Sequence, residues 1–222
     1  MNYTINNATA RMVYLESLKI AAKAGLLPQN TKNTMSDLVL EQALSTTSTI
    51  YTFPITNTQA NGTPFNTEVR LNLQDSFVAS AWGVFLLAPS GAQDATFRAL
   101  TYGSPSVLTG GGAAAAETIY NSVARVTVNN DVLIPVWHLS RHRMVPQSQQ
   151  VAAAANQNGI AEDQIDLSTD GFFPVEPYIV FIGSKNIQIV VTLPAALSAV
   201  TANSRLRIHY RGLLLQNSTT VS

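Results

Sequence analysis

The spacing of hydrophobic residues along this 222-residue chain changes near residue 48. Before that point apolar side chains recur at steps of three or four, as on one face of a helix. After it they alternate with polar ones, as in a half-buried strand. β-branched and aromatic residues, which favour strands, also become the main apolar types there. The pattern predicts a helical N-terminal arm, residues 1–45, followed by a β domain, residues 46–222.

Two helices are expected in the arm. The first covers Ala8 to Ala24, where good helix formers dominate, and Gly25 followed by Pro28 supplies its end. Its apolar stripe and basic flank consist of Met12, Leu15, Leu18 and Ala22, with Arg11, Lys19 and Lys23. A second, shorter helix is predicted from Ser36 to Leu44. The sequence leaves open whether these helices dock on their own chain or on a neighbour.

The β domain is expected to contain about nine or ten strands. Asn129-Asn130 marks a two-residue hairpin turn, because asparagine tolerates positive φ angles. Pro54 marks an edge strand or a bulge, because proline cannot donate a hydrogen bond. The predicted strands are Ile50–Ile55, Glu68–Leu73, Phe77–Ala88, Ala95–Tyr102, Arg125–Val128, Val132–Ile134, Tyr178–Ile182, Ile187–Leu193 and Arg205–Leu215.

Long, uneven connections between these strands favour a Greek-key sandwich over an up-and-down barrel, and two four-stranded sheets of this kind make a jelly roll. We therefore predict an all-β jelly-roll sandwich or barrel with a helical N-terminal arm. A single roll with long loops is favoured. A compact double roll stays open as an alternative, because about sixteen strands at roughly eleven residues each barely fit the β domain.

Composition narrows the class of protein. The chain has 13 Lys and Arg, 13 Asp and Glu, no Cys and 46% hydrophobic residues, which excludes a disordered chain, a disulfide scaffold and a cysteine-ligated zinc protein. Zero net charge argues against a surface devoted to nucleic acid. Only 12% of residues are charged, against about 25–35% on surfaces kept soluble by charge. We infer that much of the surface is covered by other copies of the chain or by partners.

Motifs for catalysis or for a bound group are missing from the sequence. It has no Gly-x-Ser-x-Gly, no His-Glu-x-x-His and no phosphate-binding loop. His138 and His142 lie in an extended run, where four residues span about 13 Å, so each is expected at the surface or an interface rather than on a metal. The acidic side chains of the segment 162–170 lack the spacing of a calcium-binding loop. No enzyme activity, cofactor or metal is expected.

The last predicted strand carries basic residues on one side. The two-residue period of a strand separates them from the apolar side chains of Leu206, Ile208 and Tyr210. This basic side could contact nucleic acid, anionic lipid or an acidic segment such as residues 162–170. The alternative is an exposed face that protects a sheet edge from aggregation. The four residues are Arg205, Arg207, His209 and Arg211.

The chain from Thr67 to Asn217 resembles virion structural proteins of bacteriophages, particularly small tailless phages. The resemblance is an overall likeness without a diagnostic motif. It rests on Thr67–Leu73 with Phe77-Val78, Ile119–Ser122 with Val126–Asn129, Arg141–Arg143 with Val145–Gln147, Gly171–Pro177, and Arg211–Asn217.

This resemblance implies a capsid protein that self-assembles into an icosahedral shell around the genome. The expected partners are copies of the chain, as trimers or other cyclic oligomers, and other virion proteins, with the genome or an internal membrane on the inner face. The expected location is the virion, after synthesis in the host cytoplasm. The arm would reach a neighbour or the interior through Arg11, Leu15, Leu18, Lys19 and Lys23.

Two other functions fit a β-sandwich. A virion spike or receptor-binding protein would bind carbohydrate on exposed aromatic rings, for which the candidates are Trp82, Trp137, Tyr178 and Phe172. Of these, Trp82 is expected in the core and Trp137 at the surface. A cupin-type enzyme would need converging histidines and a carboxylate, which three histidines at this spacing do not favour.

Overall fold

The computed structural model describes residues 8–26, 31–55, 71–89, 97–100, 118–143, 171–200 and 203–218. In these residues a helix, α1 (Ala8–Lys23), precedes nine strands, and a 3-10 turn, η2 (Leu139–His142), follows the sixth strand. The strands are β1 (Lys32–Ala43), β2 (Ile50–Ile55), β3 (Ser76–Pro89), β4 (Phe97–Leu100), β5 (Val123–Val128), β6 (Asp131–His138), β7 (Phe172–Ile182), β8 (Ile187–Thr192) and β9 (Arg205–Gln216).

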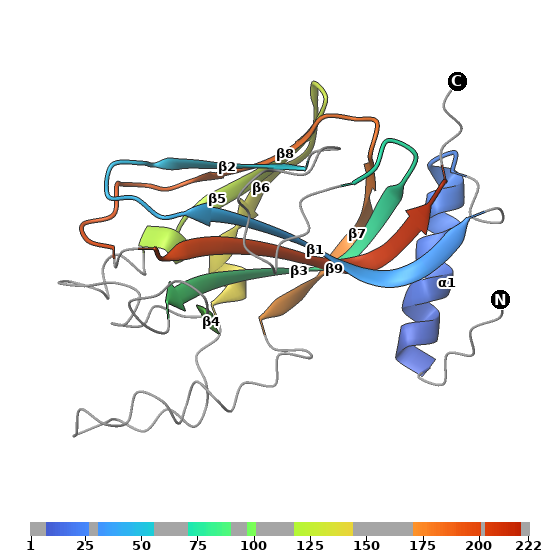
Figure 1. The fold of residues 1–222 in the computed structure, drawn as a ribbon, viewed down its shortest axis with the longest axis horizontal. Helices are drawn as coiled ribbons and strands as arrows, with labels where there is room; N and C mark the ends of the chain where they lie inside the picture. The colour runs from blue at the N-terminus through green and yellow to red at the C-terminus, as the bar shows by residue number, and fades with distance from the viewer. Residues whose placement is uncertain are drawn as a thin grey trace.

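The nine strands form two antiparallel sheets that pack face to face (Figure 1). In the five-stranded sheet β9 lies between β1 and β3, and the other side of β3 pairs with β7 along one part and with β4 along another. The four-stranded sheet has the order β2, β8, β5, β6. The prediction of a mostly-β sandwich with an N-terminal helix is confirmed.

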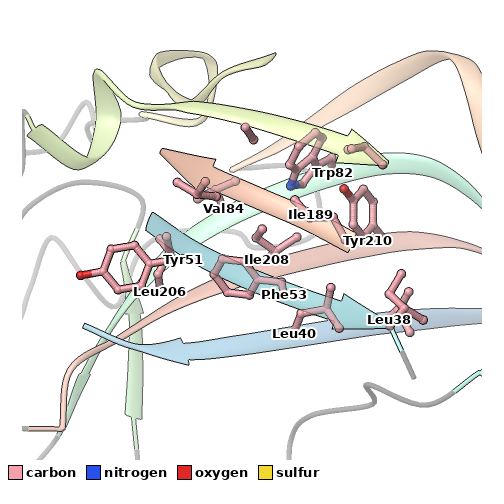
Figure 2. Packing of buried hydrophobic residues seen from close by; sticks show 14 of the residues in the cluster. Leu38, Leu40, Tyr51, Phe53, Trp82, Val84, Ile189, Leu206, Ile208 and Tyr210 are labelled. Atoms are coloured by element: carbon pink, nitrogen blue, oxygen red, sulfur yellow. The ribbon is translucent and has the colours of Figure 1, made fainter. Parts of the chain in front are cut away.

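The core lies between the sheets, and β2 and β9 contribute alternate residues to it. In β2 the residues Tyr51, Phe53 and Ile55 are buried while their neighbours are exposed. Leu206, Ile208 and Tyr210 of β9 face them from the other sheet, as Figure 2 shows. Each such side chain stabilises the fold by about 1.5–3 kcal/mol.

The helix predicted from Ser36 to Leu44 is wrong. This segment lies in β1, which pairs with β9 from Lys32 to Ala43. Leu38 and Leu40 point into the core two residues apart, as strand residues do. Helix propensity is a weak preference that long-range pairing overrides. The expected arm, residues 1–45, therefore contains both α1 and a full strand of the five-stranded sheet.

The helix predicted from Ala8 is confirmed, and so is its end at glycine. Gly25 has a φ of 81°, and the amides of Gly25 and Leu26 donate to the carbonyls of Ala22 and Ala21, which is the Schellman arrangement at a helix C-terminus. The helix lies beside the ends of β3, β7 and β9 (Figure 1). It docks there on its own chain.

The contact face of α1 differs from the predicted apolar stripe. Tyr14, Leu18 and Ala21 pack on the five-stranded sheet, whereas Met12 and Leu15 are exposed. The sheet side of this contact lies on the face away from the core and includes Val78, Leu213, Leu215, Tyr178, Val180 and Ile182. The docked face is therefore rotated from the predicted stripe and shares Leu18 with it.

The predicted hairpin around Asn129 is confirmed, with a φ of 54° at Asn129 between β5 and β6. Pro54 lies in β2, an edge strand, as expected. In the predicted strand Glu68–Leu73, residues 71–73 are not in a strand, and the rest lies outside the described residues. The acidic residues 162–170 also lie outside them.

Candidate functional site

The outer face of the five-stranded sheet has two halves along β9. Arg205, Arg207, His209 and Arg211 point outward, while Leu206, Ile208 and Tyr210 are fully buried on the other side, so the predicted alternation is confirmed. Beyond Arg211 the outward residues become the leucines on which α1 packs. One half of the outer face is therefore covered by α1. The other half is charged, and we call it the charged face.

The charged face includes two carboxylates of β1. Glu41 lies opposite Arg207 in the strand register, and Asp37 lies opposite Arg211. Both carboxylates therefore point to the same side of the sheet as the cationic residues of β9. Sequence analysis missed them because residues 36–44 were assigned to a helix. The correct strand register would have placed both beside the arginines.

Glu41 joins two arginines. Nε and Nη2 of Arg207 donate to Oε1 of Glu41 at 2.8 and 2.6 Å, and Nη1 of Arg205 donates to Oε2 at 3.4 Å. The side chain of Glu41 is only 3% exposed, so its charge is largely withdrawn from water. Removing the cationic partners would leave this carboxylate shielded from water without a compensating charge.

Asp37 forms the second, more exposed half of the network. Its Oδ1 lies 2.9 Å from Nε2 of His209 and 3.8 Å from Nε of Arg211. The hydrogen bond from His209 lowers the pKa of Asp37, and the positive charges of His209 and Arg211 lower it further against the opposing effect of burial. The carboxylate form of Asp37 is thus the one that the fold prefers.

Aromatic rings complete the charged face. The guanidinium of Arg211 lies 3.8 Å from the centroid of the Phe172 ring, and that ring meets His209 edge-on at 4.9 Å. Phe85 contacts Phe172 at 5.4 Å between ring centroids. Gly83 leaves room for these rings, because a Cβ there would lie 2.6 Å from an atom of Phe85.

The cationic residues of β9 are thus bound within the chain to carboxylates and rings. β9 lies between β1 and β3, so the interpretation of its basic side as protection of a sheet edge is wrong. The acidic partners that the structure shows are Asp37 and Glu41. A contact of this face with nucleic acid, lipid or residues 162–170 stays a prediction.

His138 and His142 occupy different environments. His138 is exposed at the end of β6, as expected. His142 is only 1% exposed, so its prediction as a surface or interface residue is wrong. The cause is η2, which turns the chain back so that Nε1 of Trp137 donates to Nε2 of His142 at 2.8 Å. Burial lowers the pKa of His142 to about 4.

Neither histidine belongs to a metal site in the described part of the chain. No group of three or more histidine, aspartate or glutamate side chains there is arranged to hold a metal ion. The imidazole of His142 is instead surrounded by rings. Trp82 and Phe173 lie 5.8 and 6.3 Å from it between centroids, and Trp137 lies 6.0 Å away.

The candidate carbohydrate-stacking residues are used in packing. Trp82 is fully buried, as predicted. Trp137 was expected at the surface, but it is half-buried and stacks on Trp82 at 5.1 Å. Tyr178 packs in the cluster under α1, and Phe172 lies under Arg211.

The predicted contact residues of the arm divide between the two sides of α1. Leu18 packs against the sheet, while Arg11, Leu15, Lys19 and Lys23 are exposed. Lys19 also lies 3.3 Å from the carboxylate of Glu16. No helix in the described residues is long and apolar enough to cross a membrane.

The chain matches no protein-family model, no curated protein and no solved structure. The resemblance to phage virion proteins therefore stays a prediction.

Proposed function

We propose that this protein is a structural subunit of a bacteriophage capsid, with a single jelly-roll fold, and that its function is self-assembly into a closed shell around the genome. Its partners are copies of itself, in trimers or other cyclic oligomers, and other virion proteins. Its location is the virion. We propose no catalytic function and no cofactor.

The order of strand pairing is the observation that carries this proposal. With β4 set aside, the first strand pairs with the last and the pairing continues inward: β1 with β9, β2 with β8, β3 with β7, and β5 with β6. The pairs β9–β3 and β8–β5 then fold this long antiparallel ribbon into two sheets. This order of pairing supports a jelly roll, an architecture of viral capsid domains.

The number of strands supports a single roll. Nine strands lie in the described residues, which fits one roll of eight with β4 added and falls well short of about sixteen for two rolls.

The surface supports an assembly function. Only 12% of the residues are charged, and the charged face uses several of these within the chain. Apolar side chains remain exposed on the edge strand β6, where Val132, Leu133 and Val136 are all at least 41% accessible. Met12 and Leu15 form a second exposed apolar site on α1. Uncharged, partly apolar surfaces of this kind are typical of contacts between subunits.

The carbohydrate-binding alternative has less support. A sugar-binding platform needs aromatic rings that face solvent. The candidate rings pack instead against one another, under Arg211 or under α1.

Light-scattering mass after size exclusion, measured over a range of protein concentrations, tests the proposal. We expect trimers, pentamers or larger closed species. The double variant Leu133→Ser, Val136→Ser removes apolar surface from β6 and should shift the distribution toward smaller species. The matched control is Val190→Ser, a half-buried apolar residue at an inner strand of the same sheet. A monomer at every concentration would contradict the proposal.

A further inference from the structure

The two sheets are joined differently at their two sides. On one side β1 and β2 are adjacent in sequence and lie close together. On the other side β6 is the edge strand of its sheet, and rings connect it to the opposite sheet. Trp137 of β6 stacks on Trp82 of β3. Trp82 in turn contacts Tyr210 of β9 at 5.1 Å between centroids, and Figure 2 shows these two residues.

The turn η2 closes this second side. It directly follows β6 and contacts β3 and β7 of the five-stranded sheet. Leu139 and His142 are its buried residues, and the amide of Leu139 donates to the carbonyl of Ser122 at 3.1 Å. His142 is therefore the polar side chain at the centre of the junction between β6 and the opposite sheet.

The hydrogen bond from Trp137 fixes the protonation state of His142. An indole N–H can only donate, so Nε2 of His142 must accept through its lone pair and the neutral ring carries its proton on Nδ1. A proton added at Nε2 would occupy that lone pair. Two N–H groups would then point at each other, the indole N–H would lose its acceptor, and a positive charge would lie on a side chain that is only 1% exposed.

The charged and titratable neighbours of His142 do not offset that charge, and the hydrogen bond of His142 to the Gly171 backbone raises its pKa by less than burial lowers it. Its own turn contributes Arg141, whose guanidinium lies 4.9 Å from the centroid of Trp137, and Arg143 follows the turn. β3 and β7 contribute the uncharged rings of Trp82 and Phe173, and β9 contributes the buried phenol of Tyr210 behind Trp82. His138 of β6 is exposed. Both charged groups in this set are cations.

We propose that His142 is an acid-sensitive latch, which in its neutral form holds β6 and η2 against the five-stranded sheet and releases them when it takes up a proton. The inference goes beyond the capsid function and does not depend on it. In a shell, the latch would loosen a sheet edge that carries exposed apolar residues.

The difference between the pKa of His142 in the native chain and in the unfolded chain determines how stability changes with pH. The pKa of His142 is lowered from 6.5 to about 4, so between these values the unfolded chain binds more protons than the native one, and stability falls as the pH falls. The equilibrium constant for opening then rises about 20-fold between pH 7 and pH 5. Carboxylates contribute little to the change of stability between pH 7 and pH 5, because the usual pKa values of aspartate and glutamate lie below this range.

Urea unfolding of the full chain at pH 7 and pH 5, followed by tryptophan fluorescence, tests the latch. We expect the unfolding constant of the wild type to rise about 20-fold at the lower pH. His142→Gln keeps an acceptor for the indole N–H without titrating and should remove most of this rise. His138→Gln, which changes an exposed histidine, should behave as the wild type. A His142→Gln variant with the full wild-type rise would overturn the proposal.

If the His142→Gln variant does not fold, hydrogen exchange of the wild type provides a second test of the latch. Hydrogen exchange of the wild type at pH 7 and pH 5, corrected for intrinsic rates, should show greater loss of protection in β6 and η2 than in β9. Equal loss in all three elements, or none in β6, would show that no local latch exists.

Discussion

Arg207 and Glu41 face each other across β9 and β1, with two guanidinium nitrogens bound to one carboxylate oxygen at 2.6 and 2.8 Å. This pair lies in one half of the outer sheet face, and α1 covers the other half. The first strand of the sheet is thus joined to the last strand both by backbone pairing and by a shielded ion pair. The pair lies near the point where the chain leaves β1 and enters β9.

Removing the carboxylate of Glu41 should destabilise the fold strongly. Glu41→Ala leaves Arg207, which is 16% exposed, without its main partner. We expect the free energy of unfolding to fall by about 3–5 kcal/mol, as measured by urea titration. Glu16→Ala removes the exposed partner of Lys19 and should change stability by less than about 1 kcal/mol. Similar effects of the two substitutions would mean that the Glu41 pair is not shielded.

Gly212 is required where β9 passes β3. A Cβ on Gly212 would collide with the carbonyl oxygen of Val78, a backbone atom that can move only if β3 moves. Gly212→Ala should therefore cost about 3 kcal/mol or more of stability. Gly83→Ala meets the ring atoms of Phe85 instead and should cost less, because a side chain can shift more easily than a strand. Thermal unfolding of the two variants gives the comparison, and the reverse order would contradict this packing.

Substitutions on the docked side and on the exposed side of α1 should have different effects on stability. Leu213→Ala opens a cavity in the cluster under α1 and should cost about 2–5 kcal/mol. Met12→Ala, at a side chain that is 72% exposed, should leave the stability of the monomeric fold within about 0.5 kcal/mol. Urea unfolding of both variants measures this difference. Equal losses would indicate that α1 docks through its Met12 side.

Asp37 should make stability depend on pH in a range separate from that of His142. Its pKa is lowered from 3.8, chiefly by the hydrogen bond from His209. Its stabilising effect is therefore present above about pH 4 and is lost as the pH falls further. Asp37→Asn should flatten the decline of stability below about pH 4, as measured by urea unfolding across that range. An unchanged decline in this variant would contradict the stabilising effect of the Asp37 carboxylate.

Alternation in the sequence was sufficient to predict β2 and the two faces of β9, because one side of each of these strands is buried. The hairpin of β5 and β6 was indicated instead by its asparagine turn. Alternation was not sufficient for β1. In that segment Leu38, Val39 and Leu40 are all buried, so no clean period appears, and the pairing that decides its structure comes from residues more than 160 positions away.

The candidate sites depended on the same long-range information. The basic side of β9 was visible in the sequence, but its partners Glu41 and Asp37 were not, since their strand had been assigned to a helix. The burial of His142 follows from η2, a turn that sequence spacing alone did not indicate. In α1 the docked face is formed by Tyr14, Leu18 and Ala21, so the stripe chosen by three- and four-residue spacing shared only Leu18 with it.

Electron microscopy of the purified full chain, applied to the largest fraction from size exclusion, tests the central claim most directly. If the protein is a capsid subunit, closed particles of uniform size or regular rings should be present without any other component. A chain that remains a monomer at high concentration and yields no particles would contradict the capsid function, although the sandwich and the His142 latch would stand unchanged.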